Sequence, residues 1–285
     1  MSSITSTTTV AFGSLNSRGY SLNSQGAQNN SMGEVPFKVP KFVDPLDKRQ
    51  WMLEHMAAAF RIFARKGFTE GTAGHISIRD PVQPDTFWIN PLGVHFGLLE
   101  ASDMVHVDED GNVIGGSKKT VNVAGFRIHS AIHKYRPDVN AACHNHSIHG
   151  KTYSAFGAPL DMLNQDACIF YNAHGVYNDF GGIVLEEQEG TRIAEALADN
   201  KALILKNHGL LTVGSTVDEA AYLFTLMEHT CQAQLLADAS NKKPAMIPPE
   251  DALYTYNHTS DPDSLYVEFQ PDLEYETFLD PSFKN

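Results

Sequence analysis

Four stretches of the chain show the three-to-four-residue apolar period of an amphipathic helix. The first follows Asp44-Pro45, a cap with proline in the first turn. The longest follows Thr216-Val-Asp-Glu219, which has the spacing of a capping box. Gly67 and Pro137 are stop signals for the first two helices. The pattern predicts helices over residues 44–67, 126–135, 189–198 and 216–239.

Short runs of aliphatic, β-branched and aromatic residues between these helices predict strands. Asp110-Gly111 is a turn signal, and Ala202 to Leu205 is an apolar run typical of a buried strand. Two runs end in polar tips that contain histidine, at His146 and at Asn207-His208-Gly209. Strands are predicted over residues 75–78, 87–90, 104–107, 113–114, 140–146 and 202–205.

The composition along the chain divides it into three parts. Residues 1–34 contain 22 Ser, Thr, Asn, Gln or Gly, which is too little apolar area to offset the entropy of ordering. We expect a disordered polar tail over residues 1–43 and a folded domain over residues 44–240. From 241 to 285 the chain is acidic with scattered aromatic residues, which predicts an arm that packs on the body or on a neighbouring subunit.

Charge and cysteine content exclude several classes of protein. The net charge is −13, so the chain has no general attraction to nucleic acid or to anionic lipid. No apolar run approaches the roughly 20 residues that span a bilayer. The three cysteines are too few and too scattered for a disulfide framework. We therefore expect a cytoplasmic protein that acts on a small molecule.

Thirteen histidines are more than one site needs, so their placement on the predicted strands selects among them. His144 and His146 are two residues apart in an extended segment, which puts both imidazoles on one face. This spacing suits two ligands of one tetrahedral metal, and His208 at another strand end is the candidate third ligand. Spacing alone is also typical of two core or surface histidines.

Three motifs resemble a known family. They are Gly71-Thr-Ala-Gly-His-Ile-Ser77, the segment from Arg136 to Ser147, and Lys206-Asn-His208-Gly-Leu-Leu211. In this order, over about residues 45–240, they resemble the class II aldolase and adducin N-terminal domain family. The resemblance implies a three-layer α/β/α sandwich around a mainly antiparallel sheet, and a homotetramer with sites between subunits. It also implies a divalent metal on His144, His146 and His208, whereas adducin-like members keep the fold without the metal.

The departures from the family pattern restrict the chemistry. The sugar phosphate aldolases have a catalytic glutamate where this chain has Gly125, and a glycine moves no proton. Their phosphate-binding groups correspond to His75, to Leu92 in the turn that ends at Gly93, and to Val123-Ala124. Apolar groups have largely replaced hydroxyl and amide donors, so we expect a substrate without phosphate.

The expected function is a metal-dependent lyase, of the decarboxylase or retro-aldolase type, on an oxygen-rich carbonyl or hydroxy acid. Zinc is expected, with manganese, cobalt or nickel as alternatives, to stabilise an enolate or phenolate. The alternatives are an epimerase or isomerase with the same chemistry, and an adducin-like scaffold. Candidate proton donors are His75, His129 and Asp166; candidate substrate-binding residues are Gly93, Gly125 and Gln165.

Some of these candidates have an ordinary structural interpretation as well. His129 is equally consistent with a hydrogen-bonded core histidine, and Gln165-Asp166 with polar residues at a strand end. Lys151, Arg61 and Arg79 are expected to be ordinary surface charges.

Overall fold

An eight-stranded sheet runs through the centre of the computed structural model, which describes residues 32, 34–184 and 186–285. The strand order is β4-β3-β2-β1-β5-β8-β7-β6. Neighbouring strands are antiparallel except β6 and β7, which are parallel. The strands are β1 (His75–Arg79), β2 (Phe87–Ile89), β3 (Val105–Val107), β4 (Val113–Gly116), β5 (Ala141–Asn145), β6 (His174–Tyr177), β7 (Ala202–Leu205) and β8 (Gly209–Gly214).

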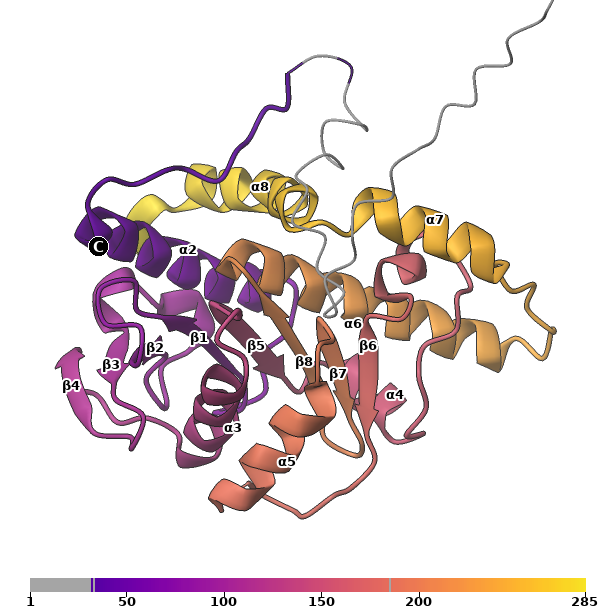
Figure 1. Ribbon diagram of the computed structural model, residues 1–285, viewed down its shortest axis with the longest axis horizontal. Helices are drawn as coiled ribbons and strands as arrows, with labels where there is room; N and C mark the ends of the chain where they lie inside the picture. The colour runs from indigo at the N-terminus through magenta and orange to yellow at the C-terminus, as the bar shows by residue number, and fades with distance from the viewer. Residues whose placement is uncertain (1–31, 33, 185) are drawn as a thin grey trace, which may run out of the picture.

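Helices cover both faces of this sheet (Figure 1). Helices α2 and α6 lie on one face, α3 and α5 lie on the other, and α8 packs across α2 and α6. The three-layer α/β/α sandwich around a mainly antiparallel sheet is therefore confirmed. The α-helices are α2 (Pro45–Arg65), α3 (Val123–Tyr135), α4 (Ile148–Ser154), α5 (Glu187–Leu197), α6 (Val217–Ala239), α7 (Pro249–Thr259) and α8 (Pro262–Leu279). Short 3-10 helices are η1 (Phe96–Leu98), η2 (Ala101–Asp103), η3 (Asp166–Phe170) and η4 (Pro281–Lys284).

Alternation along the strands sends successive side chains to different cores. Ile76 and Cys143 belong to the core shared with α2 and α6, whereas Ala142 belongs to the core shared with α3 and α5. The side chain of Ser77 also reaches α3, where it hydrogen-bonds to His129. His144 lies two residues after Ala142 in β5, so its side chain is on the α3 side of the sheet.

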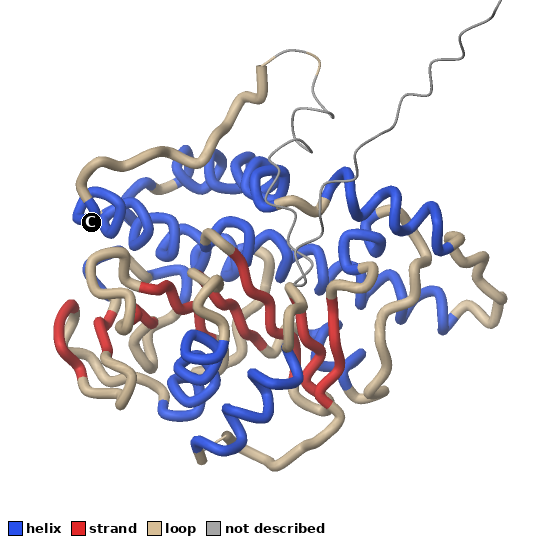
Figure 2. Tube along the Cα trace, viewed as in Figure 1, coloured by secondary structure: helices blue, strands red, loops and turns tan. Residues whose placement is uncertain are grey.

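The predicted helices and strands are all present, and Figure 2 shows the helices in blue and the strands in red. The sequence pattern missed β6, β8, α4, α7 and α8. The Thr216 hydroxyl accepts from the Glu219 N–H, as a capping box requires. The Glu219 carboxylate instead accepts from the N–H and hydroxyl of Ser215 and from Lys201. The predicted tail lies mostly outside the described residues, and residues 34–43 contain no helix or strand.

The acidic C-terminal segment forms α7, α8 and η4. Leu265, Phe269 and Phe283 are buried in the core shared with α2, while Phe278 stays exposed. Arg61 is not a surface charge, because its buried side chain donates to the Leu99 carbonyl at 2.8 Å and to Asp280 at 2.7 Å. This arginine joins α2 to the end of α8. No helix in the described part of the chain has the length and apolar character needed to cross a bilayer.

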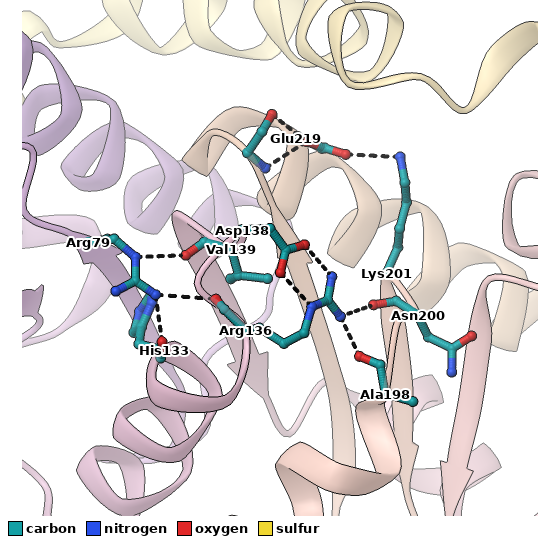
Figure 3. Close-up of polar contacts among 10 residues, drawn as sticks. Arg79, His133, Arg136, Asp138, Val139, Ala198, Asn200, Lys201 and Glu219 are labelled. Atoms are coloured by element: carbon teal, nitrogen blue, oxygen red, sulfur yellow. Dashed lines mark hydrogen bonds and ion pairs between the residues drawn. The ribbon is translucent and has the colours of Figure 1, made fainter. Parts of the chain in front are cut away.

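A half-buried and a buried arginine, Arg79 and Arg136, fix the chain before β5 (Figure 3). Arg79 donates to the carbonyl groups of His133 at 2.6 Å and Val139 at 3.2 Å, so it too is structural rather than a surface charge. Arg136 is 2% exposed and donates to the carbonyl group of Ala198. These bonds tie the end of α3 to β1 and to the C-terminal end of α5, and they hold the entry to β5 in place.

Candidate metal centre

Three histidines meet where β5 ends and β7 turns into β8. His144 lies in β5 and His146 follows it, while His208 occupies the turn before β8. Their ligand atoms all lie within 4.8 Å of one another, and the ring centroids are 4.7 to 5.1 Å apart. Asn207 adopts a left-handed conformation, φ +58°, which asparagine tolerates and which turns the chain tightly enough to present His208.

The histidine nitrogens have the protonation that a metal requires. Nδ1 of His144 lies 2.8 Å from the Leu210 carbonyl, which can only accept, so Nδ1 carries the proton and Nε2 keeps its lone pair. Burial lowers the pKa of His144 well below its usual value, that of His208 to about 4, and that of His146 by a smaller amount. Three neutral imidazoles at this separation fit a divalent cation.

These histidines form one wall of a cavity of about 610 Å³. The first turn of α3 forms a second wall, with Asn122, Ala124 and Gly125. Apolar side chains from the segment after β6 form a further wall. The remaining lining residues are Thr72, Ala73, His75, Ile128, Lys151, Phe180, Gly182, Ile183, Val184 and Asn207.

His75 lies beside the cluster because β1 and β5 pair with His75 directly opposite His144. Its ring is 6% exposed, stacks at 6.1 Å from the His144 ring, and has no hydrogen-bond partner at either nitrogen. Burial lowers the pKa of His75 to about 3, so the imidazole is neutral. A neutral imidazole offers one N–H donor and one acceptor, which makes His75 a hydrogen-bonding group rather than a strong acid.

His129 and His133 lie behind His75, in the interior beneath α3. The Ser77 hydroxyl contacts Nδ1 of His129 at 2.6 Å and Nε2 of His133 at 2.8 Å. Because this hydroxyl has one proton, one of the two rings accepts from it while the other donates to it. His129 is fully buried and does not line the cavity, so its predicted role as a proton donor is not supported by its position.

A buried glutamate fixes the chain immediately after His146. Glu228 on α6 is 1% exposed and accepts from the backbone N–H groups of His149 at 2.9 Å and Gly150 at 2.6 Å. It thereby caps the first turn of α4 and joins it to α6. Lys151, the residue after Gly150, lines the cavity and pairs with Glu70 at 2.5 Å.

The structure does not bring three other predicted residues to the cavity. Gly93 lies in an exposed turn after β2, with φ +82°, and is absent from the lining. Gln165 and Asp166 are exposed at the start of η3. Asp166 there acts electrostatically on Tyr222 of α6, whose pKa is raised mainly by burial. The structure therefore places these three residues away from the cavity of their own subunit, and their roles in a site stay predictions.

Sequence reasoning also missed residues that do line the cavity. Lys151 belongs to α4, a seven-residue helix with too few positions to show a period. Asn122 is the N-cap of α3, and its side chain accepts from the N–H groups of Ala124 and Gly125. A capping asparagine before the helix was a detectable signal. The apolar wall near Ile183 has no sequence pattern that would place it there.

Comparison with known proteins identifies relatives over most of the chain. The Meiotically up-regulated gene 14 protein of Schizosaccharomyces pombe is 52% identical over 84% of this chain and 93% of its own length. Decarboxylase NovR of Streptomyces niveus is 44% identical over 79% of this chain and 84% of its own. The 4-hydroxy-3-prenylphenylpyruvate oxygenase/4-hydroxy-3-prenylbenzoate synthase of Streptomyces roseochromogenus is 44% identical over 74% of this chain and 77% of its own.

A solved structure and a family domain also match this chain. The L-fuculose 1-phosphate aldolase of Glaciozyma antarctica superposes with a TM-score of 0.79, at 42% identity, over 85% of this chain and 94% of that one. The Class II Aldolase and Adducin N-terminal domain matches residues 54–235, which contain all three clustered histidines. The chain therefore belongs to the class II aldolase and adducin N-terminal domain family.

Proposed function

We propose that this protein is a metal-dependent decarboxylase of a hydroxylated aromatic acid or an oxo acid without phosphate. The observation that carries the proposal is the composition of the cavity wall. It contains three clustered imidazoles with ligand atoms free for a cation, and its described lining includes no carboxylate. Aldol chemistry requires a base to remove a proton, whereas decarboxylation requires only that a proton be supplied after the carbon bond breaks.

A divalent cation on His144, His146 and His208 would supply a Lewis acid that withdraws charge from substrate oxygens. The cavity also has an apolar surface, formed by Ile128, Ile183 and Val184. These side chains offer no hydrogen bond that would retain the released CO₂. In the reaction, the carbon–carbon electron pair stays with the substrate as CO₂ leaves, and that carbon then takes up one proton.

Lys151 attracts an anionic acid into the cavity. It is the one Lys or Arg side chain in the described lining, in a chain whose net charge is −13. The ammonium group faces Glu70 at the rim, so the pair can open toward a substrate carboxylate. Lys151→Met is expected to raise KM for an anionic substrate with little effect on kcat. Lys119→Met, which removes a surface partner of Asp103, serves as the control.

The α3 terminus argues against a phosphate. Helix N-termini bind phosphate through free backbone N–H groups. Here the Asn122 carboxamide oxygen already accepts from the N–H groups of Ala124 at 2.9 Å and Gly125 at 3.2 Å. A phosphate at this position would have to displace the cap.

The names of relatives support decarboxylation and also give it a competitor. One relative is named a decarboxylase, and another an oxygenase and synthase whose named substrate and product are a phenylpyruvate and a benzoate. Aldol cleavage is the second candidate, because the structure with a TM-score of 0.79 is named an L-fuculose 1-phosphate aldolase. The absence of a carboxylate from the described lining favours the first candidate.

For the metal, we propose zinc, with manganese, cobalt and nickel as alternatives for three imidazole ligands. We also propose a cytoplasmic homo-oligomer, a tetramer by comparison with the family, with a small molecule as its substrate. Light scattering of the purified protein measures the assembly, and a monomer at micromolar concentration would contradict it.

The experiment measures CO₂ release from metal-loaded protein, with and without oxygen. Its panel holds 3,4-dihydroxybenzoate, 4-hydroxyphenylpyruvate and acetoacetate, with L-fuculose 1-phosphate as the aldol substrate. We expect CO₂ from at least one acid and none with His208→Ala. Cleavage of the sugar phosphate without CO₂ from any acid would favour the second candidate. CO₂ release only with oxygen would assign an oxidative decarboxylation in place of the simple one.

A further inference from the structure

We propose that His75 and Gly125 form one specificity-determining pair, in which the missing side chain at position 125 makes room for an imidazole that binds a substrate oxygen beside the metal. The steric relation between the two residues does not depend on what the protein does. The substrate half rests on the proposed function and deepens it, because it names the group that contacts the substrate.

The two residues occupy the same space. A Cβ atom added to Gly125 would lie 2.5 Å from Cδ2, 2.6 Å from Cγ and 2.6 Å from Nε2 of His75. Real Cβ atoms are not found that close to other atoms, so any other residue at position 125 must displace the ring. The ring is 6% exposed and packs against His129 and His144, which leaves it little freedom to move aside.

Backbone geometry does not explain the glycine. Gly125 lies in the first turn of α3 and is not among the residues with positive φ. Alanine is a better helix residue than glycine at such a position. The contact with His75 is therefore the reason that the position requires glycine.

His75 has no partner that would account for its burial. Neither Nδ1 nor Nε2 has a hydrogen bond, although the ring is more than nine-tenths buried. Buried polar nitrogens rarely lack a hydrogen bond, because a nitrogen that loses its hydrogen bond to water and gains no other partner costs free energy. The ring lines the cavity next to the metal ligands, so an oxygen of a bound substrate is the partner that the geometry offers.

The pairing also explains two departures from the aldolase pattern as one. In the sugar phosphate aldolases that the three motifs resemble, a phosphate-binding group corresponds to His75 and a glutamate corresponds to Gly125. A glutamate at position 125 needs the volume that the His75 ring fills here. In this chain the cavity therefore receives its hydrogen-bonding group from β1 instead of from α3.

The steric half is tested by a thermal double-mutant cycle. Gly125→Ala is expected to lower Tm by about 3 °C or more in the wild-type background. In the His75→Ala background the same change should leave Tm unchanged or raise it, because the clash is gone and alanine favours the helix. Equal losses in both backgrounds would overturn the pairing.

Gly190 provides the matched control. This helical glycine on α5 would place a Cβ 2.6 Å from the backbone oxygen of Arg127, not from an imidazole. Gly190→Ala should lower Tm by the same amount whether position 75 is histidine or alanine. Rescue of this variant by His75→Ala would mean that His75→Ala merely loosens the fold, and the pairing would be overturned.

The substrate half is tested by binding to the cobalt-loaded protein, read from its visible spectrum. The probes are 3,4-dihydroxybenzoate, which can reach both the metal and His75, and azide, which needs the metal alone. We expect His75→Ala to weaken binding of the dihydroxybenzoate at least tenfold and to leave azide binding and cobalt content unchanged. His75→Gln, which keeps an N–H donor, should recover part of the loss.

The outcomes separate this inference from the proposed function. Unchanged dihydroxybenzoate affinity in His75→Ala, or no binding of this probe to the cobalt-loaded wild type, would overturn the substrate contact. Equal weakening of azide would assign His75 to the metal site instead and would also overturn it. None of these readouts needs turnover, so failure of every acid to release CO₂ would refute only the decarboxylase.

Discussion

Acidification should destabilise this protein well above the pH at which its carboxylates titrate. His75, His129 and His133 are buried, and burial lowers the pKa of each, to about 3 for His75 and His133 and well below the usual value for His129. In the unfolded chain the same groups titrate near 6.5. The unfolded state therefore binds more protons below pH 6.5, and stability falls as the pH decreases from 6.5 toward the folded pKa values.

The magnitude follows from proton linkage. Consider a histidine that stays neutral in the folded state and has a pKa of about 6.5 in the unfolded state. Such a residue lowers the free energy of unfolding by roughly 1.4 kcal/mol between pH 7.5 and 5.5. His75, His129 and His133 together should lower the free energy of unfolding by about 4 kcal/mol over this pH range. The free energy of unfolding of a whole domain is roughly 5–15 kcal/mol. Below about pH 3, His75 and His133 are protonated in both states and cause no further loss of stability.

Urea unfolding at pH 7.5, 6.5 and 5.5, at one protein concentration, measures this dependence. His133 is the residue to change, since it lies outside the metal cluster and outside the cavity lining. In His133→Asn the loss between pH 7.5 and 5.5 should shrink by about 1.4 kcal/mol. His95→Asn, at an exposed ring, should keep the wild-type dependence. Equal losses in His133→Asn and wild type would refute the reasoning.

Four further outcomes are expected. Elemental analysis should find about one divalent metal per chain, and His208→Ala should lower this content at least tenfold. Gly125→Glu should reduce turnover with metal retained, because its carboxylate displaces His75 and repels an anionic substrate; higher activity would contradict this. Lys201→Met, which leaves the buried Glu219 carboxylate without the ammonium shown in Figure 3, should cost about 3–5 kcal/mol in urea unfolding. A panel of sugar phosphates should give kcat/KM well below about 10⁴ M⁻¹s⁻¹, and values above it would contradict the substrate class.

The histidine cluster was predictable in part, because the two-residue spacing of His144 and His146 at the end of β5 is a local signal for a common face. His208 joins them through the pairing of β8 with β5 and β7, which spacing along the chain does not show. The steric relation between His75 and Gly125 was not predictable, since it depends on how far α3 lies from β1. The residue types showed that positions 75 and 125 each depart from the family pattern. They did not show that the ring at position 75 is the reason for the glycine at position 125.

The missed helices have equally physical causes. In α8 the apolar residues are interrupted by Pro271, which lacks an N–H and normally ends a helix, yet burial of one face in the core keeps the helix continuous. Only His146 and Ser147 separate α4 from β5, and the cap of α4 comes from Glu228, which is distant in sequence. Local patterns cannot show a helix whose stabilising partner is supplied by another element.

The two sides of the cavity are held by different means, and this affects how the protein can evolve. Backbone pairing among β1, β5, β7 and β8 positions the histidine wall, so the geometry of this wall depends on the sheet as a whole. Another wall comes from loop residues such as Phe180 and Ile183, which are 58% and 77% exposed. Substitutions in this loop can change the size of the accepted substrate at little cost to folding or metal affinity. Related chains with the same histidines can therefore diverge in substrate while the metal centre is inherited unchanged.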